Sequence, residues 1–237
     1  MRVAALADVH GNAPALEAVL VEVARERVDL VVFCGDLTWG PLPRETLALV
    51  RGLETPARFV RGNAERALEE DCEERAGWLR ALHSEADRRL LRGFERAVVV
   101  DVDGLGPTRF CHGSPRSDEE CVTERTPVER VREFLEGVDE RAVVTAHTHV
   151  RYDRSVQGLR LVNPGSVGMP YEGARGAYWA LLGPDVEHRH TEYDVDRAVA
   201  LYRASGDPRA ELMVELLLEP ASREEAIAHA ESVRFSG

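Results

Sequence analysis

Seven residues with metal-ligating side chains follow short apolar runs of the sequence, each where a strand is expected to end. They comprise two carboxylates, four imidazoles and one carboxamide: Asp8, His10, Asp36, Asn63, His112, His147 and His149. Carboxylate oxygen with imidazole nitrogen suits Mn, Fe, Zn, Co or Ni rather than Ca²⁺ or a metal held by thiolates. Seven ligands are too many for one tetrahedral ion and about right for two ions that share a bridging carboxylate and a water.

Each fragment alone has an ordinary explanation, because Asp-x-His occurs by chance and Gly-Asp and Gly-Asn are common turn dipeptides. Their occurrence in order after β-like runs favours the metal site, since four of the eight histidines stand at such positions. If the backbone stays extended, Asp8 and His10 point the same way, as do His147 and His149. Each pair then reaches one ion or two neighbouring ions.

The elements that must position these side chains alternate in type. Three short apolar runs are each followed by a polar tip and then by a helical pattern. The runs cover residues 2–7, 29–34 and 57–61, and the helical patterns cover residues 14–26, 43–53 and 64–93. This repetition is typical of βα units and a largely parallel sheet. Because ligands bind at the carboxyl ends of strands in such sheets, we expect the polar tips to converge.

The sequence pattern changes in the second half of the chain, where short predicted strands are separated by turn residues. Strands are predicted at 97–102, 108–111, 142–146, 152–156, 159–162 and 177–182, and one helix at 127–135. Hairpin signals stand at Val102-Asp103-Gly104 and Val156-Gln157-Gly158. Helices at 194–204 and 209–233, the latter broken at Pro220, close the chain. We predict one domain over residues 1–237, with 206–237 as a C-terminal helical extension.

Composition excludes several classes of function. The chain of 237 residues carries a net charge of −12, which disfavours nucleic acid and anionic membrane as partners. It contains no lysine, which excludes Schiff-base chemistry, the P-loop lysine and the kinase strand lysine. The four cysteines, Cys34, Cys72, Cys111 and Cys121, form no C-x-x-C pair, and we expect reduced thiols in a cytoplasmic protein. No apolar stretch approaches the roughly 20 residues of a membrane span.

The ordered blocks resemble those of the calcineurin-like metallophosphoesterase superfamily, which are D-x-H, G-D, G-N-H-[ED], a single histidine and G-H-x-H. The chain offers Asp8-Val9-His10, Gly35-Asp36, Gly62-Asn63-Ala64-Glu65, His112 and Ala146-His147-Thr148-His149. Asn163-Pro164-Gly165-Ser166 and Tyr193-Asp194 are similar to the small bacterial and archaeal phosphodiesterase branch. The resemblance covers residues 1 to about 205.

The resemblance implies a four-layer α/β/β/α sandwich of two mixed sheets with flanking helices. It also implies that Asp8, His10 and His149 hold the first metal, that Asp36 bridges both metals, and that Asn63, His112 and His147 hold the second. Asp36, Asn63 and His112 are the catalytic candidates. Asn63 and Asn12 are the candidates for substrate binding, with a helix N-cap as the alternative role of Asn12. Glu65 matches an acidic position that orients a ligand.

The chain departs from the resemblance at Ala64, where the superfamily has a histidine that assists the leaving group. Losing a positioned general acid costs about 10²–10⁴ in rate when the leaving group is basic. We therefore expect a binuclear-metal-dependent phosphodiesterase for small phosphodiesters or nucleotides rather than for alkyl monophosphates. In this scheme the two divalent ions lower the pKa of a bridging water, and the resulting hydroxide attacks phosphorus in line.

Two alternatives remain open at this point. The chain is alternatively a non-catalytic metal-binding interaction protein on the same fold, as is the retromer's phosphoesterase-like subunit, although its metal-ligand positions are intact. It is alternatively a monophosphatase, a phosphoprotein phosphatase or a dinucleoside-polyphosphate phosphatase with the same site and different loops. The expected partner is a small phosphate ester, with no extended nucleic acid and no membrane, and a homo-oligomer is left open.

Several other residues have two interpretations. Trp39 stands close to Asp36 and either packs in the core or stacks on an aromatic leaving group. His83 and His229 lie in charged helical patterns, so we predict both on the surface. His188 and His190 alternate on one predicted strand face among charged residues, which is typical of a solvated face.

Overall fold

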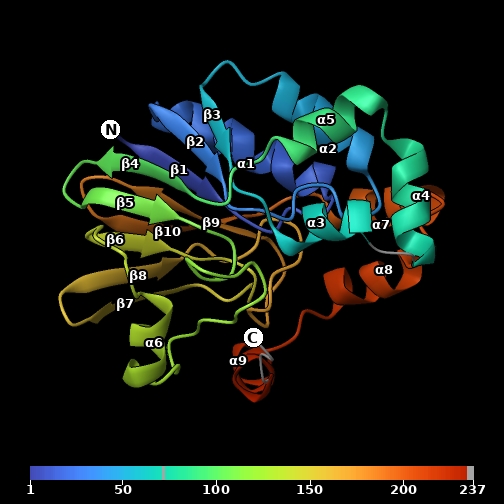
Figure 1. The fold of residues 1–237 in the computed structure, drawn as a ribbon. Helices are drawn as coiled ribbons and strands as arrows, with labels where there is room; N and C mark the ends of the chain where they lie inside the picture. The colour runs from blue at the N-terminus through green and yellow to red at the C-terminus, as the bar shows by residue number, and fades with distance from the viewer. Residues whose placement is uncertain (71–72, 234–237) are drawn as a thin grey trace.

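Two five-stranded sheets face each other in the computed structural model, which describes residues 1–70 and 73–233 (Figure 1). The first sheet has the order β10-β9-β1-β2-β3. Its strands are β1 (Val3–Leu6), β2 (Leu30–Phe33), β3 (Ala57–Phe59), β9 (Ala177–Leu182) and β10 (Val186–Thr191). The strands β1, β2 and β3 are parallel, and β9 pairs antiparallel with both β1 and β10.

The second sheet has the order β4-β5-β6-β8-β7. Its strands are β4 (Val98–Val102), β5 (Gly106–Phe110), β6 (Ala142–Val144), β7 (Tyr152–Val156) and β8 (Leu159–Asn163). The three central strands β5, β6 and β8 run parallel, with β4 and β7 antiparallel at the two edges. The pairs β4–β5 and β7–β8 are the two hairpins predicted from their glycine turns.

The core between the sheets is built from small branched side chains. Val3 and Ala5 of β1 point into it and meet Val98, Phe110 and Val144 of the second sheet. The alternate residues of β1, Ala4 and Leu6, pack on the helices outside the sheet. Both faces of the central strands are therefore buried, which explains why they read as continuous apolar runs in the sequence.

Helices cover the outer face of each sheet. The helices that follow the first three strands are α1 (Ala13–Glu26), α2 (Pro43–Arg51), α3 (Asn63–Glu70), α4 (Glu74–Leu82) and α5 (Glu85–Arg92). α6 (Val128–Phe134) packs on the second sheet through Val131 and Phe134. The last three helices are α7 (Val195–Ala204), α8 (Ala210–Leu218) and α9 (Arg223–Ser232). The predicted four-layer sandwich of two mixed sheets with flanking helices is confirmed.

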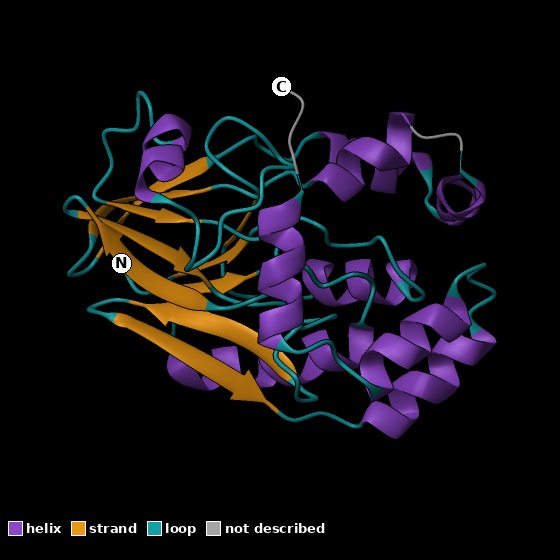
Figure 2. Cartoon of the chain, turned by 90° about the horizontal axis from the view of Figure 1, so that it is seen from below, coloured by secondary structure: helices purple, strands orange, loops and turns teal. Residues whose placement is uncertain are grey.

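The described helices and the strands gather on different sides of the molecule. In Figure 2 the strands occupy one side and most helices the other, with the loops that join them between. The region predicted as one helical pattern at 64–93 contains the three helices α3, α4 and α5. None of the helices in the described part of the chain has the length and apolar character needed to cross a bilayer.

Two of the remaining expectations need correction. His83 is buried, at 4% exposure, because it closes α4 against α2 and donates its Nδ1 hydrogen to the Leu79 carbonyl oxygen at 2.7 Å. His188 is half-buried, since its Nε2 lies 2.8 Å from the Asn163 carbonyl oxygen, whereas His190 and His229 are exposed as expected. Cys34, Cys111 and Cys121 are free thiols, and Cys72 lies outside the described residues.

Candidate metal centre

All seven predicted ligand residues lie where strands of the two sheets end. Asp8 and His10 follow β1, Asp36 follows β2, and Asn63 begins α3 just after β3. His112 follows β5, and His147 and His149 follow β6. Because the carboxyl ends of parallel strands point to one edge, the fold brings residues distant in sequence to one place.

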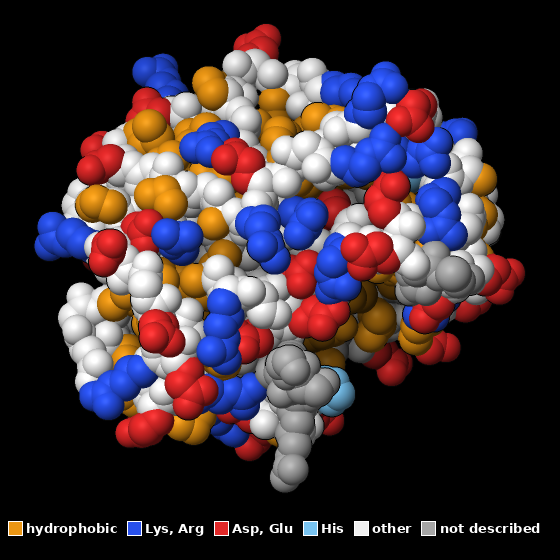
Figure 3. All heavy atoms as spheres, viewed as in Figure 1, with side chains coloured by type: hydrophobic (Ala, Val, Ile, Leu, Met, Phe, Trp, Pro, Cys, Tyr) orange, Lys and Arg blue, Asp and Glu red, His pale blue; other side chains and the backbone are white. Residues whose placement is uncertain are grey.

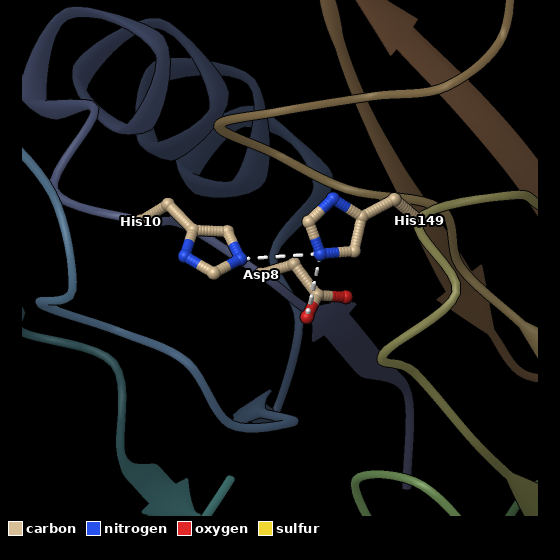
Figure 4. Close-up of side chains that lie close together, drawn as sticks. All are labelled: Asp8, His10 and His149. Carbon is tan, nitrogen blue, oxygen red and sulfur yellow. Dashed lines mark hydrogen bonds and ion pairs between the residues drawn. The ribbon is translucent and has the colours of Figure 1, made fainter. Parts of the chain in front are cut away.

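Asp8, His10 and His149 form a first group, in which one ligand atom from each lies within 4.8 Å of the others. The Nε2 atoms of His10 and His149 are 3.1 Å apart, and His149 Nε2 is 3.4 Å from Asp8 Oδ1. Figure 4 shows both rings and the carboxylate pointing toward one point. This is the spacing of three ligands around a common centre.

Asp36, His112 and His147 form a second group with the same 4.8 Å limit. His112 Nε2 lies 3.4 Å from Asp36 Oδ1 and 2.9 Å from the amide oxygen Oδ1 of Asn63. Asn63 therefore belongs to this second group by position. Together the four residues offer two oxygens and two nitrogens.

Asp36 faces both groups with different oxygens. Its Oδ1 is the oxygen near His112, and its Oδ2 is 3.7 Å from His10 Nε2 in the first group. A carboxylate that presents one oxygen to each of two ligand groups has the geometry of a bridging ligand.

The backbone at the ligands is left-handed rather than extended. The angle φ is 53° at Asp8, 46° at His10, 55° at Asp36, 67° at His147 and 57° at His149. The condition of an extended backbone is therefore not met: Asp8 and His10 still reach one group, whereas His147 and His149 reach two different groups. A left-handed non-glycine residue costs about 1–2 kcal/mol. Such strain at five ligands is typical of a functional site.

Backbone carbonyls orient three of the imidazoles. The Nδ1 hydrogens of His10, His112 and His149 point to the carbonyl oxygens of Trp39 at 3.2 Å, Cys34 at 2.7 Å and Met169 at 2.6 Å. Because a carbonyl oxygen only accepts, each Nδ1 carries a hydrogen, and Nε2 is the ring nitrogen that would bind an ion after losing any proton of its own. These carbonyls were not foreseen, since main-chain partners leave no signal in residue types.

The resulting donor set fits a cation in two respects. The Nε2 atoms of His10 and His149 face each other at 3.1 Å, which is the spacing of two ligands of one ion. Asp8 Oδ1 is buried and has no hydrogen-bond partner among the described residues. A buried carboxylate oxygen without a partner is costly unless a charge satisfies it, and a divalent ion between these atoms does so.

The charges of the site are strongly coupled. Burial, together with the charge of the neighbouring imidazole, lowers the pKa of both His10 and His147 to about 4. Burial acts in the same direction on His112, but the Asp36 carboxylate outweighs it and raises the pKa of His112 to about 10. Burial would raise the pKa of Asp36, yet His112 holds it below its usual range. A bound metal ion replaces the proton that this pair shares.

Glu65 ties the loop of Asp36 to the loop of Asn63. Its carboxylate accepts hydrogen bonds from the backbone N–H groups of Asp36 at 3.0 Å, Leu37 at 2.8 Å and Gly62 at 2.8 Å. Burial and the nearby Asp36 charge raise the pKa of Glu65 to about 7. Glu65 thus positions the backbone of a ligand rather than touching the ligand atoms.

The glycines before Asp36 and Asn63 permit the close approach of these loops. A Cβ at Gly62 would lie 2.1 Å from Asp36 Oδ1, and a Cβ at Gly35 would lie 2.5 Å from His112 Nδ1. Gly35 also has φ of +94°, which disfavours any side chain. The Gly-Asp and Gly-Asn dipeptides are therefore required by space at the site itself.

Of the two roles considered for Asn12, its contacts are those of a helix N-cap. Its Oδ1 accepts the Ala15 N–H at 3.1 Å and so caps α1. Its Nδ2 donates to the Gly168 carbonyl oxygen and to the Tyr193 hydroxyl, both at 3.0 Å. Both amide hydrogens are used and the side chain is fully buried, so Asn12 has no donor left for a substrate. These contacts favour the capping role of Asn12 over the predicted role in substrate binding.

Residues 163–169 form hydrogen bonds to the loops that carry the candidate ligands. Ser166 Oγ donates to the Asp8 carbonyl oxygen at 2.8 Å, and Asn163 Nδ2 donates to the Ala146 carbonyl oxygen at 3.1 Å. Tyr171, which sequence reasoning missed, stacks on the His149 ring with centroids 4.8 Å apart. An isolated tyrosine in a loop gives no sequence signal for such a contact.

A cavity of about 370 Å³ opens beside the ligands. His10, Asp36 and Asn63 line one part of it, and Ala64 and Trp39 adjoin them. Its other lining includes the apolar side chains Met169, Leu212, Met213 and Leu216. Three of these belong to α8, so the C-terminal helices contribute a wall next to the candidate ligands.

The sequence matches a known family model, and the fold matches solved structures. Residues 1–183 match the family model of the calcineurin-like phosphoesterase superfamily domain. The crystal structure of a metallophosphoesterase from Sphaerobacter thermophilus is 28% identical and has a TM-score of 0.75, covering 92% of this chain and 99% of that chain. A hypothetical protein from Pyrococcus horikoshii shares the fold at 20% identity and a TM-score of 0.80, covering 93% of this chain and 99% of its own.

A sequence relative comes from Methanocaldococcus jannaschii. It is an uncharacterized protein, 23% identical over 224 residues, and the match covers 83% of this chain and 89% of that protein. The matches therefore cover between 83% and 93% of this chain.

Proposed function

The chain belongs to the calcineurin-like phosphoesterase superfamily, and from this premise we propose that it is a binuclear-metal-dependent phosphodiesterase of small phosphodiesters or nucleotides. The observation that carries the proposal is the position of Asp36, whose two oxygens face two separate groups of ligand atoms. A single structural ion would need neither the second group nor the shared carboxylate.

Each group would hold one divalent ion. Asp8, His10 and His149 supply the ligands of the first, and Asn63, His112 and His147 supply those of the second, with Asp36 common to both. When bound, two such ions supply a water of lowered pKa and positive charge toward the phosphoryl oxygens. The mixture of carboxylate and imidazole favours Mn²⁺, Fe, Zn²⁺, Ni²⁺ or Co²⁺, and we propose Mn²⁺ as the first to test.

The protein's own contribution is a fixed arrangement of ligands. The carbonyl oxygens of Trp39, Cys34 and Met169 hold three imidazole rings in one orientation. Glu65 holds the backbone of Asp36 against that of Gly62. Because these groups are in place before substrate arrives, little reorganisation is needed when charge develops on the phosphoryl group.

The cavity beside the ligands supports a diester with an apolar or aromatic leaving group. Ala64 stands in its wall with a methyl group where a general acid would be useful. Glu65, the next residue, already accepts three backbone hydrogen bonds. The cavity is lined by Glu73 rather than Glu65, and Glu73 forms an ion pair with Arg209 at 2.8 Å. The partly buried Trp39 and the side chain of Met169 offer surfaces on which an aryl group or a nucleobase packs.

Cleavage of aryl phosphodiesters is expected to depend steeply on the leaving-group pKa. Without a residue to protonate it, the leaving oxygen departs with a full charge, which only acidic phenols tolerate. Alkyl monophosphates are therefore expected to be poor substrates. A series of aryl phosphodiesters with graded phenol pKa, assayed with Mn²⁺, Ni²⁺, Zn²⁺ and Co²⁺ added separately, measures this slope.

The variant Ala64→His tests the absence of a general acid by introducing an imidazole at position 64. Its imidazole is expected to raise activity on alkyl monophosphates by at least about tenfold and to flatten the slope. Ala67→His, at a neighbouring residue of α3 that also lines the cavity, is the matched control. A flat slope in the wild-type protein, with efficient cleavage of alkyl monophosphates, would show that position 64 has been misread. Two bound metals with no hydrolysis of any ester would instead favour a non-catalytic interaction protein.

A further inference from the structure

A second cavity, of about 190 Å³, lies next to His112 and is lined by three arginines. These are Arg61, which follows β3, Arg96, which precedes β4, and Arg116, in the loop after β5. Figure 3 shows arginine side chains gathered near the centre of the face that carries these loops in Figure 1. His112 also belongs to the second ligand group, so this cavity adjoins the candidate metal centre.

The acidic side chains near this cavity already have partners. Arg116 is bound by Glu120, with Nε–Oε1 and Nη2–Oε1 distances of 2.9 and 2.7 Å. Asp118 accepts a hydrogen bond from Arg66 Nε at 2.9 Å. The positive charge of Arg116 and the negative charge of Asp118 are therefore both compensated within the protein.

Arg61 and Arg96 have no such compensation. Across residues 1–70 and 73–233, neither guanidinium forms an ion pair or a hydrogen bond with a protein group. The nearby acid Glu95 is held by Arg58, with Nη2–Oε2 at 2.6 Å. The chain has a net charge of −12. Arg66, Arg75 and Arg116 each form an ion pair with an acid. Two guanidinium groups without an acidic partner line one cavity beside a candidate metal ligand, and this arrangement favours binding of an anion.

We propose that Arg61 and Arg96 form a subsite for a second phosphate group of the substrate. The inference rests on the proposed function, since it places this group beside the ester being hydrolysed. Guanidinium groups bind phosphate oxygens in pairs and keep their charge at any physiological pH. The substrate class is then a phosphodiester that bears a further phosphate, with its apolar part in the cavity lined by α8.

Binding of inorganic pyrophosphate to the metal-free protein tests the subsite without any catalytic step. Calorimetry is expected to show binding to the wild-type protein, weakened about tenfold in Arg61→Ala or Arg96→Ala and more in the double variant. Arg132→Ala is the matched control, because this exposed arginine of α6 lies outside the cavity. The proposal is overturned if the wild-type protein does not bind pyrophosphate or if the double variant binds it equally well.

A matched pair of substrates tests the role in recognition. The 4-nitrophenyl ester of thymidine 5′-phosphate is compared with the same ester carrying a 3′-phosphate, using the Mn²⁺-loaded protein. The wild-type protein is expected to have a lower KM for the second ester, and the double variant is expected to lose this preference. An equal preference in both proteins would contradict the subsite. Failure of the wild-type protein to cleave either ester would count against the proposed function, whereas the pyrophosphate result would still decide the subsite.

Discussion

The variant Asp36→Asn is expected to lower kcat/KM for an aryl phosphodiester by roughly 10³-fold at saturating metal. Asparagine keeps the shape of the side chain but removes the charge shared by the two ligand groups. It also turns an amide N–H₂ toward Nε2 of either His10 or His112, where each group requires an oxygen. The loss of several kcal/mol of charge stabilisation corresponds to this change in rate.

Two other asparagine positions are the controls for this comparison. Asn63→Ala removes one neutral oxygen from one group, so we expect a smaller loss of rate than in Asp36→Asn. Asn12→Ala removes a helix cap and two further hydrogen bonds, which costs stability but removes no ligand atom. Steady-state kinetics with metal content measured on the same samples ranks the three variants. Near-wild-type turnover of Asp36→Asn would refute the bridging assignment.

Removal of divalent metal is expected to lower the midpoint of thermal unfolding by about 10 °C. Without an ion, several ionisable side chains are packed together in a buried site and Asp8 Oδ1 has no hydrogen-bond partner among the described residues. An ion at about 1,000 times its Kd adds about 4 kcal/mol to the free energy of unfolding. For a chain of this length, 1 kcal/mol moves the midpoint by about 2–4 °C.

Calorimetric scans of the protein after chelation and after addition of Mn²⁺ measure this difference. The double variant His10→Ala with His112→Ala, which removes one imidazole from each ligand group, is expected to lose most of the response to Mn²⁺. Glu187→Ala, at a side chain of the edge strand β10 that belongs to neither ligand group, should keep it. Identical midpoints with and without metal in the wild-type protein would mean that the two groups do not bind ions.

The sequence predicts the strands and helices well where burial is two-sided or where glycine marks a turn. The runs before Asp8 and Asp36 read as strands because both of their faces are buried between the second sheet and the helices. The hairpins follow from Gly104 and Gly158, which adopt positive φ at their turns. The convergence of the ligand residues follows from the polarity of parallel strands alone.

Other features depend on tertiary contacts that residue types do not encode. The separation of His147 from His149 arises from left-handed backbone at both residues, whereas spacing alone suggests a shared direction. Burial of His83 depends on how α4 packs against α2, where Arg44 Nε donates to the Leu82 carbonyl oxygen at 2.8 Å. The approach of α8 to the candidate metal centre likewise depends on its packing against α7.

The central claim is that Asp36 joins two metal sites in one centre. Elemental analysis after reconstitution with Mn²⁺ and removal of unbound ion tests it most directly. We expect close to two Mn²⁺ per chain in the wild-type protein, since seven oxygen and nitrogen ligands lie in two groups around one shared carboxylate. A stable content of one Mn²⁺ per chain at saturation would contradict the binuclear centre.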